Sequence, residues 1–267
     1  MYLSVAILLG FFEALAPVVL ALGVAFAWKP RRESGVIASG AAGFAIGVAL
    51  FLAAWVGKQL ALMAGLQPIL ADASTPLHLA RSAAGIGLLA GGMEEGVRFA
   101  AAWVLFRHVR RARPLRAGLL FALGWGGIEA AIVSLSAIVA LMQTLGDVPA
   151  ASMPPAWLPF AGLAERSSAI LLHVAFTAFA VRAAMSESRA AWRLFAIAFA
   201  AHAALDAALH ALYVPANAAL DRARWGVAGG WLFAAELVFA AGAVALAIAA
   251  SRLPISSGRS EARAPSA

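Results

Sequence analysis

Two short motifs of ionisable side chains stand inside apolar stretches of the sequence. Glu94 and Glu95 are adjacent, and Arg98 follows Glu94 by four residues, so Glu94 and Arg98 share a helix face and can form an ion pair. His202 and Asp206 have the same spacing, which places an imidazole and a carboxylate one helical turn apart. Both motifs therefore bring unlike, reactive groups together on single helices.

Glu129 and His173 stand in two further apolar stretches. Histidine nitrogens and carboxylate oxygens are ligands that Zn²⁺ takes in catalytic sites, which keep one position open for water. A metal ion makes that water a nucleophile at neutral pH, and a free glutamate can accept its proton. The chemistry that these side chains could perform together is the hydrolysis of an amide bond.

The composition indicates a membrane protein, because 63% of the residues are hydrophobic, 12% are charged and the mean hydropathy is +0.88. The net charge of +7 does not indicate nucleic-acid binding, since the positive residues lie in short loops between apolar runs. The chain has no cysteine, which excludes disulfides, thiolate metal sites and cysteine nucleophiles.

Apolar runs of about 20 residues recur along the chain, which is the length that a helix needs to cross the hydrocarbon core. We expect an all-α, polytopic bundle of about seven transmembrane helices, forming one domain over residues 1–250 and followed by a disordered cytoplasmic tail over 251–267. The less apolar residues 57–80 are expected at the membrane interface. The expected spans are 2–28, 35–56, 82–106, 115–145, 160–181, 192–213 and 227–250.

Most of the 20 lysines and arginines fall on one side of this arrangement. Positively charged loops stay in the cytoplasm, so the N-terminus is expected outside and the C-terminus in the cytoplasm. The N-terminus lacks the basic segment and the cleavage site of a signal peptide, so the first span is expected to be retained. The expected partners are membrane lipid and a transmembrane or membrane-proximal peptide, with no nucleic acid; the sequence carries no signal for an oligomeric state.

Glu94 and Glu95, Glu129, His173 and His202 all fall near the middle of the third, fourth, fifth and sixth expected spans. A charged side chain at the bilayer centre costs roughly 2.5–3.5 kcal/mol on insertion scales. Four helices that bear this cost at one depth predict a shared site. Buried Glu–Arg and His–Asp pairs can also simply hold helices together, and chains of such groups can relay protons, so both alternatives stay open.

Taken together, the motifs resemble the YhfC family of intramembrane metalloproteases, which is grouped with the CAAX prenyl proteases, the bacteriocin-processing proteins and the PrsW proteases. The resemblance implies a multi-pass protein of a bacterial-type plasma (inner) membrane and a divalent metal cofactor, Zn²⁺. The segments that carry it are Glu94-Glu95-x-x-Arg98, Phe121-x-x-x-Trp125-Gly126-Gly127-Ile128-Glu129, Glu165-Arg166 with His173, and His202-x-x-x-Asp206.

The resemblance implies catalytic roles for the first motif. Glu94 and Glu95 match the paired glutamates, one of which activates the water, and Arg98 matches the basic residue that pairs with them. The same resemblance implies metal-site roles elsewhere in the chain. His173 and His202 match the histidines, with Asp206 or Glu129 as a further ligand or a supporting partner.

The chain departs from the family pattern at Trp125, where the second motif, Phe-x-x-x-His, has its histidine. Tryptophan cannot bind a metal, because its indole N–H is only a donor. One alternative is that the site uses His173, His202 and a carboxylate such as Glu129. The other is a non-catalytic scaffold or immunity-type protein of the same fold. A transporter is a third possibility, although the sequence shows no internal repeat.

Overall fold

The structure is a computed structural model of the chain. It describes residues 40–66, 74–108, 114–145, 158–220 and 225–252, together with a few positions between 7 and 19. Most of the expected first span, including its Glu13, and the residues after Arg252 lie outside the described residues. Ser251 and Arg252, which the sequence assigns to the disordered tail, belong to the last helix.

The described chain is helical throughout and contains no strand, which confirms the all-α prediction. Two π-helical turns, η2 (Leu62–Leu66) and η3 (Trp103–His108), continue the helices before them. The long helices are α2 (Gly40–Ala61), α4 (Pro76–Ala102), α5 (Pro114–Leu145), α6 (Leu158–Met185), α7 (Ser188–Leu220) and α8 (Trp225–Arg252).

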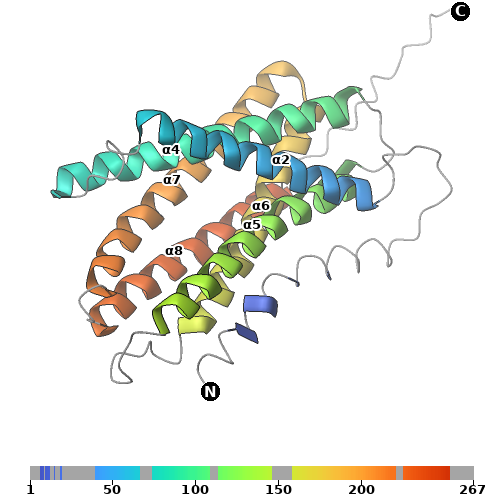
Figure 1. Cartoon of the computed structure of the whole chain (residues 1–267). Helices are drawn as coiled ribbons and strands as arrows, with labels where there is room; N and C mark the ends of the chain where they lie inside the picture. The colour runs from blue at the N-terminus through green and yellow to red at the C-terminus, as the bar shows by residue number, and fades with distance from the viewer. Residues whose placement is uncertain are drawn as a thin grey trace, which may run out of the picture.

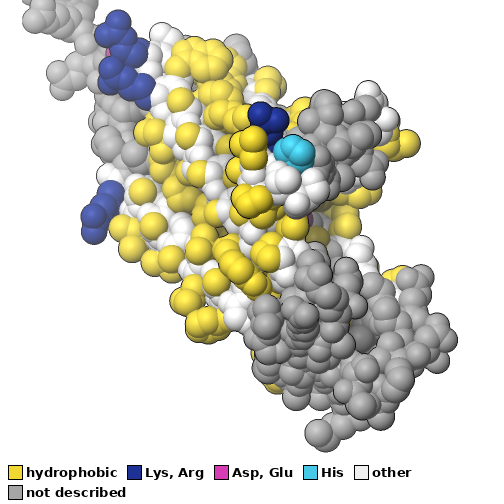
Figure 2. Space-filling model, turned by 90° about the vertical axis from the view of Figure 1, so that its left-hand side faces the viewer, with side chains coloured by type: hydrophobic (Ala, Val, Ile, Leu, Met, Phe, Trp, Pro, Cys, Tyr) yellow, Lys and Arg dark blue, Asp and Glu magenta, His cyan; other side chains and the backbone are white. Residues whose placement is uncertain are grey.

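Five helical segments among the described residues are long and apolar enough to cross a membrane. They are Ala42–Ala64, Ala117–Ser136, Phe160–Met185, Ser188–Ala216 and Gly229–Arg252. Their outer faces carry exposed large hydrophobic side chains, including Met63 on α2 and Phe233 on α8. Figure 2 shows one face of the molecule on which hydrophobic side chains cover most of the described surface. These features indicate a membrane protein.

The ends of α2 and α4 differ from the expected spans. The sequence predicts a separate interfacial stretch over residues 57–80, whereas residues 57–66 extend α2 and η2, and residues 76–80 form the start of α4. Gly57 lies within α2 and provides room for Met93 of α4, since a Cβ at Gly57 would lie 2.5 Å from Met93 Cε. Lys58 consequently lies inside a helix.

Two pairs of helices approach closely through glycines. A Cβ on Gly47 of α2 would lie 2.1 Å from the Phe121 carbonyl oxygen of α5, and a Cβ on Gly124 of α5 would lie 2.1 Å from the Phe44 carbonyl oxygen of α2. The Gly43-x-x-x-Gly47 pattern thus marks a helix contact, as small residues do in membrane bundles. In the same way, a Cβ on Gly87 of α4 would lie 2.1 Å from the Ala203 carbonyl oxygen of α7.

Helix α6 occupies the middle of the bundle, where it contacts α4, α5, α7 and α8 (Figure 1). Its apolar face packs with α7 and α8 in a core that includes Phe176, Phe179 and Phe239. A second core, between α2 and α5, surrounds Trp125 with Phe51 and Phe121. The buried residues of α4 recur every three or four positions and include three charged side chains, so α4 turns a polar face toward the bundle interior.

Candidate metal centre

A cavity of about 90 Å³ lies where the six long helices meet. It has room for a metal ion with a water molecule, since one water takes up about 30 Å³ in the liquid. Its polar lining comes from five helices and its apolar lining mainly from α6. The lining residues are Lys58, Glu94, Glu129, Ala169, Leu172, His173, Phe176, His202, Leu205, Asp206 and Phe239.

Exposure divides the polar lining into a rim and a floor. The side chains of Lys58, Glu129 and Asp206 are 25%, 24% and 26% exposed, which places them at the rim. Glu94 and His202, at 7% each, form the floor together with the equally buried His173. The cavity is therefore shielded at its base and open to its surroundings on the side of the rim.

His173 is held from both sides of its ring. Arg98 Nη2 donates to His173 Nδ1 over 2.8 Å, and His173 Nε2 donates to Glu129 Oε2 over 2.5 Å. Because a guanidinium can only donate, Nδ1 must be the acceptor and the ring proton must be on Nε2. Gly126 on α5 leaves room for this ring, since a Cβ there would lie 2.9 Å from His173 Cδ2.

Glu95 and Arg98 form a closed pair beneath the cavity. Arg98 has no exposed surface, and its Nη1 contacts Glu95 Oε1. The same carboxylate oxygen accepts from His202 Nδ1 over 2.7 Å. The guanidinium also lies 4.6 Å from the centre of the Trp125 ring, a distance at which cation–π attraction operates. Glu95 is thus fully engaged and does not line the cavity.

His202 presents its other nitrogen to the cavity. Its Nε2 lies 3.6 Å from Asp206 Oδ2 and 3.9 Å from Glu94 Oε2, and it makes no hydrogen bond with either oxygen. Phe176 stacks on the ring at 4.8 Å with the two planes 3° apart. The Nδ1 bond to Glu95 fixes the ring orientation, and metal-binding histidines ordinarily donate their second N–H to a carboxylate in this manner.

Glu94 differs from its neighbour in having a free oxygen. Lys58 Nζ donates to Glu94 Oε1 over 3.4 Å. Glu94 Oε2 is buried without a hydrogen-bond partner among the described residues. A buried carboxylate oxygen ordinarily has partners. This oxygen lies on the cavity side, where a water or a cation can reach it.

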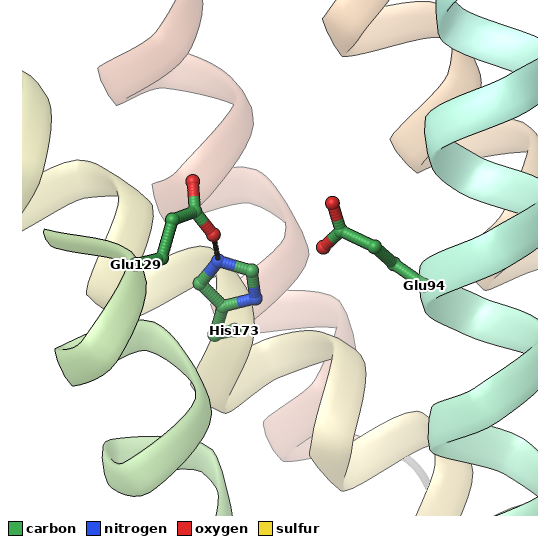
Figure 3. Close-up of side chains that lie close together, drawn as sticks. All are labelled: Glu94, Glu129 and His173. Atoms are coloured by element: carbon green, nitrogen blue, oxygen red, sulfur yellow. Dashed lines mark hydrogen bonds and ion pairs between the residues drawn. The ribbon is translucent and has the colours of Figure 1, made fainter. Parts of the chain in front are cut away.

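The residues of the cavity fit a divalent cation. Glu94, Glu129 and His173 each offer a ligand atom within 4.8 Å of the others, and Figure 3 shows Glu94 facing the other two across open space. Two ligands on one tetrahedral Zn²⁺ lie about 3.3 Å apart, given bonds of about 2.0–2.1 Å. Small side-chain rotations would therefore bring these atoms, or His202 Nε2, to one point.

The formal charges agree with this fit. In the described network around the cavity, five carboxylates meet three cationic side chains, which leaves two negative charges when both histidines are neutral. The carboxylates are Glu94, Glu95, Glu129, Glu165 and Asp206, and the cations are Lys58, Arg98 and Arg166. Buried charge requires compensation, and one divalent cation would supply it.

The structure joins all seven predicted site residues in one network, divided between the cavity and its support. Glu94, Glu129, His173, His202 and Asp206 line the cavity, whereas Glu95 and Arg98 lie behind it. Trp125 is fully buried and is absent from the lining, so its indole does not fill the cavity.

Sequence reasoning missed Lys58 and Phe176 as lining residues. The signal for Lys58 was the apolar sequence Leu60–Ala64, which continues the helical run past the lysine. Phe176 follows His173 by three residues and therefore shares its helix face. A further contact, Ser82 Oγ to His210 Nε2 at 2.9 Å, links α4 to α7 farther along the His202–Asp206 stripe.

Comparison of the chain with protein-family models, with curated proteins and with solved structures finds no match.

Proposed function

We propose that this protein is a membrane-embedded hydrolase that uses a divalent metal ion, Zn²⁺, to cleave a peptide bond in a transmembrane or membrane-proximal substrate. The observation that carries the proposal is the pairing of two features on the cavity floor. Glu94 Oε2 is buried without a hydrogen-bond partner among the described residues, with the Arg98 guanidinium 3.9 Å away, and His202 Nε2 faces the same space while Glu95 holds its Nδ1.

In this proposal His202 would hold the metal through Nε2, with Glu129 and Asp206 as carboxylate ligands from the rim. His173 would join them through Nε2 once that nitrogen gives up its proton and its contact with Glu129, and Nδ1 takes the proton as Arg98 turns away. A bound metal ion would supply a polarised water. Glu94 Oε2, the unpartnered carboxylate oxygen of the cavity, would accept the proton from that water. Glu95 and Arg98 act as positioning residues, because each contacts a cavity histidine from behind. Leu172 and Phe239 would exclude bulk water from the apolar side of the cavity.

The proposal includes seven spans in a bacterial-type plasma membrane, with the N-terminus outside and the C-terminal tail in the cytoplasm. A site enclosed by apolar helices supports a substrate that itself lies in or beside the membrane. Its peptide bond would enter past the rim formed by Lys58, Glu129 and Asp206.

The test is the metal content of the purified protein and of matched variants. We expect about one equivalent of Zn²⁺ in the wild type and a strong reduction in His202→Ala, because the alanine variant loses a ligand. His78→Ala, a half-buried histidine at the start of α4 that does not line the cavity, serves as the control and should keep its metal. Equal, near-zero metal in the wild type and His202→Ala would contradict the proposal.

Variants of the two adjacent glutamates distinguish a proton acceptor from a residue that positions a metal ligand. Glu94→Gln should retain metal and abolish hydrolysis, since an amide cannot accept the proton. Glu95→Gln should weaken metal binding, because His202 Nδ1 loses its carboxylate partner; changes in such partners typically cost 10–100-fold. Loss of metal in Glu94→Gln would show that Glu94 is itself a ligand.

A second candidate function, a non-catalytic membrane scaffold, is favoured by the bonding of His173. Both of its ring nitrogens are engaged, and Arg98 and Trp125 pack tightly beside it. A scaffold would bind no metal, and its polar network would serve only to hold the helices in place.

A further inference from the structure

We propose that Lys58 is the resident counter-ion of the cavity and that its positive charge opposes the binding of a divalent cation there. This inference rests on the proposed metal site and concerns what sets its occupancy. Lys58 lines the cavity from α2, and its Nζ lies 3.4 Å from Glu94 Oε1. Its ammonium group therefore already balances the charge of a carboxylate that lines the cavity into which a divalent cation would bind.

The chemistry of lysine suits this role. An ammonium is a compact point charge on a flexible stem with rotatable donors, whereas a guanidinium is a planar fork that fixes its partner in one geometry. The sequence has 20 lysines and arginines, and Lys58 is one of only two lysines. At this position a group that can swing aside contacts the carboxylate whose second oxygen lacks a hydrogen-bond partner among the described residues. With its side chain 25% exposed, Lys58 can turn from the cavity toward the rim.

The other cations around the cavity are fixed more firmly. Arg98 is fully buried between Glu95, His173 and Trp125. Arg166 contacts Glu165 and lies 3.7 Å from Glu129. Among the described residues, Lys58 forms its hydrogen bond and ion pair with Glu94, and the contact is longer than an ordinary hydrogen bond. It is the cation that a metal can displace with the least disturbance of the network.

The positive charge of Lys58 would therefore lower the affinity of the site for a metal ion. Without metal, Lys58 compensates Glu94 and links α2 to α4. With metal, two positive charges lie within a few ångströms of the ammonium, and repulsion at that distance is large in a poorly hydrated cavity. Metal loading should therefore be reversible and should respond to the metal concentration around the protein.

The experiment measures Zn²⁺ affinity by calorimetry on the full-length protein in detergent, for the wild type, Lys58→Met and Lys58→Arg. Methionine keeps the length of the apolar stem and removes the charge. We expect Lys58→Met to bind Zn²⁺ at least about tenfold more tightly than the wild type, whereas Lys58→Arg should bind no more tightly. The control is Arg189→Met, an exposed cation at the start of α7, which should leave the affinity unchanged.

Thermal unfolding of the same variants gives a second measurement, which stays informative if Lys58→Met folds poorly. Without metal, Lys58→Met should melt below the wild type, because Glu94 has lost its counter-ion, and added Zn²⁺ should raise its Tm by more than it raises that of the wild type. Recovery of Lys58→Met only when metal is supplied would support the same conclusion.

The outcomes distinguish this inference from the proposed function. Zn²⁺ binding by the wild type with no gain in Lys58→Met would overturn the role of Lys58 and leave the metal site intact. Binding by Lys58→Met alone would support the counter-ion and contradict a metal enzyme in the wild type. Absence of binding in both would overturn both proposals.

Discussion

Glu94 and Glu95 show how one helix gives two adjacent carboxylates different chemistry. Neighbouring helical residues point about 100° apart, because the helix has 3.6 residues per turn. Glu95 turns toward Arg98 and His202, which both donate hydrogen bonds to its Oε1. Glu94 turns toward the cavity, and its Oε2 has no hydrogen-bond partner among the described residues. The sequence motif identified the pair but could not assign the roles, because the roles depend on α7 and on Lys58 of α2.

Replacement of Arg98 by methionine should strongly destabilise the protein. Glu95 would remain buried without its cation, and His173 Nδ1 would lose its donor. Removing one partner of a buried ion pair costs about 3–5 kcal/mol. Denaturant unfolding in detergent would measure this loss.

The exposed Arg189→Met provides the control, with an expected change of less than about 0.5 kcal/mol. Arg98→Lys should be intermediate, because one ammonium cannot reach both Glu95 and His173 in the geometry of the guanidinium fork. An Arg98→Met variant as stable as the control would show that the buried network contributes nothing to the fold.

At the scale of single residues, the sequence predicted that Glu129, His173 and His202 would meet, and they do. The cost of polar groups within apolar spans was sufficient for that inference. The position of Trp125 beside Arg98 was not predictable, because a cation–π contact between different helices leaves no local pattern in the sequence.

The contact between α4 and α7 fixes the relative positions of the two ionisable motifs. Gly87 meets Ala203, Ser82 meets His210 and Glu95 meets His202, so the two helices run in opposite directions. Backbones can approach this closely only where side chains are absent. Glu95 of α4 can reach His202 because the absence of a side chain at Gly87 lets the backbones of α4 and α7 come close.

Gly87→Ala should therefore separate α4 from α7, since the added Cβ would lie 2.1 Å from a backbone oxygen that cannot rotate away. We expect a loss of at least about 1–3 kcal/mol, the usual cost of overpacking, together with weaker metal binding. Unfolding and metal content would be measured on the same preparation.

Gly96→Ala is the matched control on the same helix, because nothing lies within 4 Å of a Cβ there. It should be neutral or slightly stabilising, as alanine favours the helix over glycine. If both alanine variants behaved alike, close packing at Gly87 would not be what positions the site.

At the scale of elements, the helices were predictable from apolar runs, and their ends were less so. The sequence places the end of the second span at Val56, whereas α2 continues to Ala61. Gly57, which could have ended the helix, instead packs against Met93 of α4, and a contact between two helices leaves no signal in one segment. At α4 the local signals do agree, because Thr75 Oγ1 accepts from His78 N and Pro76 occupies the first turn.

Among the described residues, large apolar side chains are exposed along the helices whereas Glu94, Glu95 and Arg98 are buried, which is the arrangement expected of a membrane bundle. Composition and run length predicted this from the sequence, and the five long apolar helices confirm it. The topology predicted from lysine and arginine positions remains a prediction, because the direction of insertion depends on the membrane and not on the internal packing.

Single cysteines would test that topology, since the chain has none of its own. Ser188→Cys, at the exposed junction of α6 and α7, should react with a membrane-impermeant maleimide only after the cells are opened. Ser74→Cys, exposed just before α4, should react in intact cells. The reverse pattern would invert the orientation, and labelling of both positions in intact cells would contradict the arrangement of spans between them.

The two-sided bonding of His173 limits which amino acids the position can tolerate. Its ring accepts from Arg98 on one edge and donates to Glu129 on the other. Asparagine is too short to reach both neighbours. Glutamine would have to place its oxygen and nitrogen on opposite sides of a flexible chain. Arginine or lysine at this position could not accept a hydrogen bond at all. Imidazole is the only natural side chain that carries an acceptor and a donor at opposite edges of one rigid ring. Fewer residue types should therefore be accepted at position 173 than at the carboxylates around it. At those positions aspartate and glutamate can replace each other if the side-chain length is accommodated by a small shift.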